Sequence, residues 1–130
     1  MAPVLLFLAC GKKEASQEEV KSDLIQSISL CSEADTFVRY ISQGHSTYSF
    51  ASGHLRYLLE EVNRNTQELS HLNAAPDLQK ILDLDRVQLN LLSTQIETVS
   101  RHLGESEVPV DSERQIAKIR MTLVQANSHL

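Results

Sequence analysis

The sequence predicts an all-α protein, an antiparallel up-down-up-down four-helix bundle preceded by a flexible N-terminal segment. Apolar residues recur at alternating spacings of three and four over most of the chain, which is the period of an amphipathic helix. The 130 residues include only 4 glycines and 3 prolines, which argues against a turn-rich all-β chain. This length suits one domain, so we expect residues 1–16 to form a separate segment and residues 17–130 to form the bundle.

Local sequence signals place the helix boundaries. Ser46 or a neighbouring hydroxyl residue can cap the second helix, and Pro76 suits the opening turn of the third. Gly104 suits a left-handed C-terminal cap, and Asp111 or Ser112 is expected to cap the fourth helix. The short connections make neighbouring helices antiparallel. The expected helical ranges are 17–43, 47–72, 76–103 and 111–129.

One polar residue interrupts each of the two most regular apolar stripes. These residues are Asn65 in the second expected helix and Asp85 in the third. If the two helices fold back about residues 74–76, both side chains lie at one level of the core. An amide that donates to the carboxylate satisfies both groups, whereas either group alone in a dry core costs about 1–3 kcal/mol. We predict a polar core layer that fixes the register; the alternative is a ligand or proton site inside the bundle.

Aromatic residues gather around the first expected turn. Phe50, His54 and Tyr57 lie on one stripe of the second helix, separate from the stripe that begins with Tyr48 and forms its apolar seam. Gly53 lies among them and suggests the close approach of another backbone, either that of the first helix or that of a partner. We expect the aromatic side chains to plug the end of the bundle and pack the turn onto the fourth helix. The alternative is a surface for a partner or a small ligand. Two more aromatic residues lie just upstream, Phe37 and Tyr40.

Charge and motifs exclude several classes of function. The 12 basic and 17 acidic residues give a net charge of −5, so no basic surplus is present to bind nucleic acid. The sequence has no phosphate-binding glycine loop, nucleophile elbow or closely spaced set of Cys and His ligands. Glu68 and His71 have a Glu-x-x-His spacing that di-iron bundles use twice, but it occurs once here. We therefore expect no catalytic, cofactor-binding or metal-binding residues.

The first residues carry the signal that bears on location. Residues 4–9 are uninterrupted apolar sequence, too short to span a bilayer, and they are followed by Cys10 and a polar stretch. This arrangement resembles the end of a bacterial lipoprotein signal. The resemblance implies that a diacylglyceryl group is attached to the Cys10 thiol and that residues 1–9 are removed. The alternative is a short apolar tail in which Cys10 is a plain thiol.

The sequence does not identify a biochemical role. We expect a non-enzymatic helical-bundle protein of the bacterial cell envelope, anchored through Cys10 on the periplasmic or outer face of a membrane. Its role would be structural or an interaction with another envelope protein. The alternative is a soluble ligand-sensing or oligomerising module of the cytoplasm or periplasm. Some apolar residues lie off the strict seams and could widen the buried faces or form a homodimer contact. These are Leu30, Leu59, Leu84, Val87 and Leu91.

Overall fold

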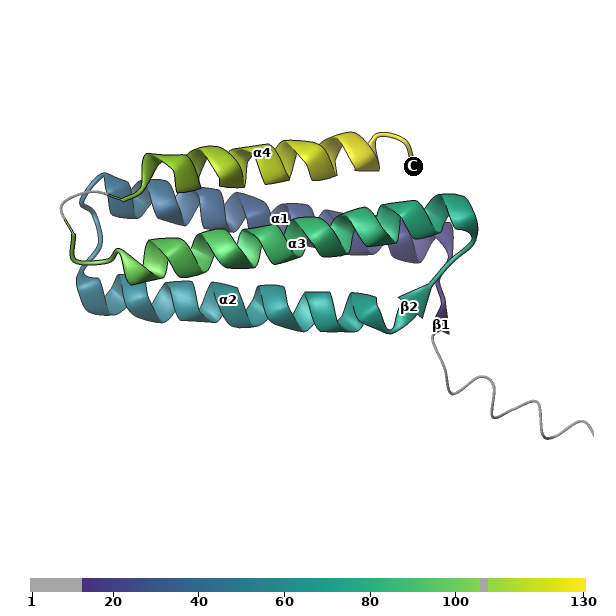
Figure 1. The fold of residues 1–130 in the computed structure, drawn as a ribbon, viewed down its shortest axis with the longest axis horizontal. Coiled ribbons are helices and arrows are strands. Elements are labelled where there is room, and N and C mark those ends of the chain that lie inside the picture. The colour runs from purple at the N-terminus through teal and green to yellow at the C-terminus, as the bar shows by residue number, and fades with distance from the viewer. Residues whose placement is uncertain (1–12, 106–107) are drawn as a thin grey trace, which may run out of the picture.

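Four long helices pack side by side in the computed structural model, which describes residues 13–105 and 108–130 (Figure 1). Helix α1 contacts the other three helices, and α3 contacts α2 and α4 as well. Helices α1 and α3 are therefore the diagonal pair that lies closer together across the bundle. The predicted four-helix bundle is confirmed, and each helix boundary falls close to the expected residue. The helices are α1 (Gln17–Ser42), α2 (Tyr48–Ser70), α3 (Pro76–Arg101) and α4 (Val110–Asn127).

The apolar stripes form the core, as their spacing predicts. The central leucines of α2 and α3, among them Leu58 and Leu92, are completely buried. Ser93 of α3 donates a hydrogen bond to Asn63 of α2 at 3.3 Å, which is consistent with the antiparallel alignment of these helices. Tyr48 departs from the expectation: its residue is 63% exposed, because it begins α2 at the end of the bundle, beyond the core.

The apolar residues off the strict seams divide between core and surface. Leu30 is buried, and Leu59 and Leu84 are half-buried against the core, so these three widen the packed faces. Val87 and Leu91 are 52% and 46% exposed on α3. The homodimer contact stays a prediction. Of the five residues, only Val87 and Leu91 have largely exposed side chains that could form it.

Polar caps begin the first two helices. Ser16 and Glu19 form a reciprocal capping box at α1, and the Thr47 hydroxyl accepts from the Phe50 amide at 3.3 Å to cap α2. The expected cap of the fourth helix is wrong. Helix α4 begins at Val110 with no side-chain cap, and Ser112 is buried inside its first turn.

Glycine ends α1 through a left-handed turn. Gly44 has a φ of +76°, and its amide donates to the Ile41 carbonyl, while the His45 amide donates to the Tyr40 carbonyl. These two bonds form a Schellman motif, which reverses the chain with its last carbonyls satisfied. The turn brings the end of α1 against the start of α2. Gly104, at φ +88°, is left-handed as predicted.

The chain joins the bundle before α1 begins. Strand β1 (Lys13–Glu14) pairs in parallel with β2 (Leu72–Asn73), which lies in the α2–α3 connection (Figure 1). The Ala15 amide donates to the Asn73 carbonyl at 2.6 Å, and Ala15 is buried. No pattern in the sequence predicts this pairing, which makes residues 13–16 part of the folded unit. Among the described residues, no helix combines the length and apolar character that a membrane crossing requires.

Candidate functional site

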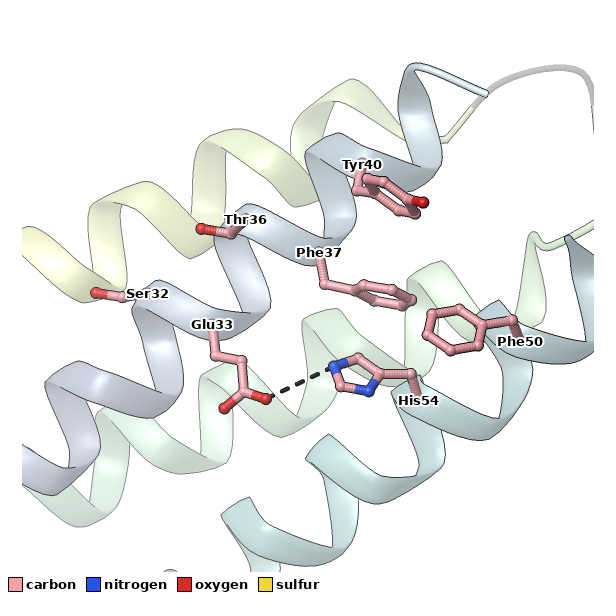
Figure 2. Close-up of a pocket in the computed structure, with 7 residues that line it drawn as sticks. All are labelled: Ser32, Glu33, Thr36, Phe37, Tyr40, Phe50 and His54. Atoms are coloured by element: carbon pink, nitrogen blue, oxygen red, sulfur yellow. Dashed lines mark ion pairs between the residues drawn. The ribbon is translucent and has the colours of Figure 1, made fainter. Parts of the chain in front are cut away.

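An apolar groove of about 500 Å³ runs between the C-terminal half of α1 and the start of α2. We call it the α1–α2 groove. Figure 2 shows Glu33 and Phe37 of α1 pointing toward Phe50 and His54 of α2. The groove is lined by Ser32, Glu33, Thr36, Phe37, Tyr40, Phe50 and His54.

Helical spacing places these side chains on two facing stripes. Glu33, Phe37 and Tyr40 follow one another by four and three residues along α1. Phe50 and His54 have the same relation on α2, and the stripe continues to Tyr57. The Schellman turn at the end of α1 and the Thr47 cap fix where α2 begins. The two stripes can therefore face each other across the groove.

The aromatic side chains form a connected cluster. The rings of Phe37 and His54 have centroids 4.2 Å apart, and Phe50 lies 5.9 Å from Phe37 in an edge-to-face arrangement. The Phe50 and His54 rings are nearly parallel, with 2° between their planes. Tyr40 stacks on Phe37, and Tyr57 extends the cluster from His54 along α2. The predicted gathering of aromatic residues around the first turn is thus observed.

The cluster forms a surface instead of a plug. Phe37 is only 8% exposed and holds the cluster to the core. Phe50 and Tyr57 remain 59% and 48% exposed. The expected packing against the fourth helix is therefore wrong for these two residues. The alternative, a surface that includes Phe50, His54 and Tyr57, is the one that the geometry favours.

Gly53 does not mark a close helix contact. A Cβ atom added there would meet no atom within 4 Å, and the residue is exposed. The expected approach of the first helix is therefore wrong, and the approach of a partner stays a prediction.

One ion pair crosses the groove. The Glu33 Oε1 atom of α1 lies 3.6 Å from Nε2 of His54 on α2 (Figure 2). The Glu33 side chain is 45% exposed and the His54 side chain 28%, so both remain accessible from solvent. Sequence reasoning identified His54 but missed Glu33. The signal that could have found it is its position four residues before Phe37, on the same stripe of α1.

The predicted polar layer is buried, but its two members find different surroundings. Asn65 accepts a hydrogen bond from Gln26 of α1 at 3.3 Å, where sequence analysis expected a bond to Asp85. Neither carboxylate oxygen of Asp85 has a hydrogen-bond partner of full geometry. The expected bond between Asn65 and Asp85 does not form, because α1 also packs against α2 and α3 and supplies polar groups of its own at this level, including Gln26.

Burial dominates the acid–base behaviour of this layer. It raises the pKa of Asp85 from 3.8 to about 7, with a smaller contribution from the Asp23 carboxylate; the nearby Ser27 hydroxyl partly opposes the shift. Burial, with Asp85 beside it, also raises the pKa of the Cys31 thiol to about 12, so Cys31 is a protonated core residue at neutral pH. A cavity of about 10 Å³ between α1 and α2, lined in part by Ser27 and Asn65, is at the lower limit for one water molecule. It leaves no room for an organic ligand.

The sequence also bears on metal binding and on lipid attachment. The part of the chain that the structure describes contains no group of three or more His, Cys, Asp or Glu side chains placed to hold a metal ion. Cys10, the expected lipidation site, lies outside the described residues.

Comparison of the sequence with protein-family models, with curated proteins and with solved structures finds no match.

Proposed function

We propose that this protein is a small, non-enzymatic binding protein of the bacterial cell envelope, anchored by a lipid on Cys10. The α1–α2 groove is its binding site for a ligand or partner group with an apolar face. The observation that carries the proposal is the exposure of Phe50 and Tyr57 beside a groove already lined by Phe37 and Tyr40. Exposed aromatic side chains that gather around one hollow are typical of binding sites.

The groove is preorganised for binding. Phe37 is fixed in the core, and contacts between rings connect it to Phe50 and His54. Aromatic side chains have few rotatable bonds, so little conformational entropy is lost when a ligand covers them. The groove opens sideways between two helices, which leaves the continuous core of the bundle intact.

The anchor and the groove belong to opposite ends of the bundle. Lys13 pairs with Leu72, and only three peptide steps separate it from Cys10, a reach of at most about 11 Å. A lipid on Cys10 would hold the α2–α3 end of the bundle close to the membrane. Glu33 and Tyr40 lie roughly 25–35 Å farther along α1, at a rise of about 1.5 Å per residue. The groove would therefore be presented away from the attached end.

The groove is tested by titrating isotope-labelled protein with a soluble neutral probe, 2-phenylethanol, and following resonances by NMR. We expect saturable shifts at Phe37, Phe50 and His54, and weaker binding in Phe50→Ala, whose exposed side chain can be removed with little effect on folding. Val87→Ala is the matched control, since it removes an exposed apolar side chain from α3. Shifts that do not saturate, or that are equal in both variants, would contradict the proposal.

The anchor is tested by detergent phase partitioning of the full chain expressed in a bacterial host. We expect the wild type in the detergent phase and Cys10→Ser in the aqueous phase. Cys31→Ala is the control, because it removes the other cysteine of the chain and should leave partitioning unchanged. A wild-type protein that stays wholly aqueous rules out the anchor. The same groove would then belong to a soluble ligand-sensing or oligomerising module, the alternative from sequence.

A further inference from the structure

We propose that the α1–α2 groove takes a small organic cation, one in which an ammonium group is joined to an aromatic or branched aliphatic body. The cationic nitrogen would lie beside Glu33, and the apolar body would cover the rings of Phe37 and Phe50. This inference rests on the proposed function and adds the chemical class of the ligand.

Charge on the groove favours a cation. Glu33 is the acidic group among the lining residues, and no Lys or Arg is among the described residues that line the groove. The chain as a whole carries a net charge of −5. A carboxylate at the edge of an apolar surface attracts an ammonium group and repels an anion of the same shape.

The rings add a second attraction for the same charge. The face of an aromatic ring is the negative end of its quadrupole, and a cation within about 6 Å of the ring centre is stabilised by it. Phe37, Tyr40 and Phe50 line the same groove as Glu33, whose carboxylate points toward His54 (Figure 2). A ligand with both a positive charge and an apolar body would satisfy the carboxylate and the rings together.

The volume of the groove suits a small molecule. The volume of about 500 Å³ falls within the range of roughly 300–1,000 Å³ that small-ligand sites occupy.

Two neighbouring side chains can oppose the binding of a cation. His54, when protonated, competes with it for Glu33. Arg120 of α4 donates to Ser32 at 3.0 Å and brings a positive charge near one edge of the groove.

The test compares three probes of nearly equal shape: 2-phenylethylammonium, 2-phenylethanol and phenylacetate, which are cationic, neutral and anionic. Binding is followed by NMR at the resonances of Phe37, Phe50 and His54, at constant ionic strength and pH. We expect the cation to bind about fivefold more tightly than the alcohol, a ratio appropriate to one half-exposed ion pair with ring contacts. Phenylacetate should bind most weakly.

Variants connect this preference to single groups. Glu33→Gln should remove the preference for the cation while it leaves the affinity for 2-phenylethanol unchanged, since the apolar surface is retained. Glu60→Gln is the matched control for net charge, because Glu60 is an exposed carboxylate on the other helix, α2. This variant should keep the preference for the cation. His54→Phe should preserve or increase it, because the imidazole no longer competes for Glu33.

The outcomes separate this inference from the proposed function. If the alcohol binds in the groove and the ammonium probe binds no better, the cation inference is wrong and the binding groove stands. If phenylacetate binds most tightly, Arg120 controls the charge preference and the cation inference is likewise overturned. If no probe shifts the groove resonances in a saturable way, both proposals fail.

Discussion

At the scale of single residues, Asp85 is a carboxylate buried in the core of the bundle. Its carboxylate is 1% exposed and has no full hydrogen bond, and burial raises its pKa to about 7. An ionised carboxylate in such a place costs free energy that a proton removes. The sequence located this residue correctly, but not its surroundings, because its neighbours come from a helix far away in the chain.

The raised pKa predicts that stability decreases as pH rises from about 4 to 7. Below this interval Asp85 is protonated in both the folded and unfolded chain; within it, only the unfolded chain loses the proton. The shift corresponds to about 4 kcal/mol lost by pH 8 relative to pH 4. Asp85→Asn should remove most of this decrease, measured by urea denaturation across the interval. Burial and the neighbouring carboxylates of Glu19 and Glu68 also raise the pKa of Asp23, so a smaller decrease of the same sign should remain.

The matched control for this measurement is Asp111→Asn, an exposed carboxylate in the first turn of α4. It should keep the full pH dependence of the wild type. An equal dependence in wild type and Asp85→Asn would show that Asp85 ionises freely in the folded protein.

At the scale of the elements, glycines have opposite roles in α1 and α2. Gly44 adopts a φ of +76° to end α1, a conformation that side chains disfavour. Gly53 lies inside α2 with helical neighbours and open space around it. The sequence suggested another backbone close to Gly53, whereas the structure leaves open space at its Cβ position. The difference depends on the backbone conformation and on what surrounds the Cβ position.

A pair of alanine substitutions tests this difference. Gly53→Ala should stabilise the protein by about 0.5–1 kcal/mol, because alanine has the higher helix propensity and meets no atom there. Gly44→Ala should destabilise it by about 1 kcal/mol, because the turn needs a left-handed residue. Both changes are measured by urea denaturation at one pH. Effects of the same sign at the two positions would contradict the assignment.

At the scale of the whole molecule, the packing of α1 against α2 brings five aromatic side chains into one cluster beside the groove. The sequence placed Phe50, His54 and Tyr57 on one stripe but could not decide which direction that stripe faces. Contacts between α1 and α2 bury Phe37 and leave Phe50 and Tyr57 exposed. Glu33 joins the site for the same reason, since it lies opposite His54 only after the helices pack.

This arrangement predicts unequal costs for removing the aromatic side chains. Phe37→Ala should destabilise the bundle by about 3 kcal/mol, as expected for a nearly buried phenylalanine. The double variant Phe50→Ala with Tyr57→Ala should lose about 1 kcal/mol or less, because both side chains are largely exposed. Thermal and urea unfolding give the comparison. A large loss of stability in the double variant would show that Phe50 and Tyr57 pack into the end of the bundle, as the sequence suggested, and would contradict their assignment to a surface.

The sequence alone determined the helices, their boundaries and the side of each that is buried. A period near 3.6 residues and the local caps are properties of contiguous segments, and hiding an apolar stripe leaves little choice of fold. Tertiary packing decided which groups lie together: Gln26 beside Asn65, Ser27 near Asp85, β1 beside β2, and Glu33 across from His54. These contacts join residues distant in the chain, and their geometry depends on three or four helices at once. A pattern read along one helix cannot contain that information.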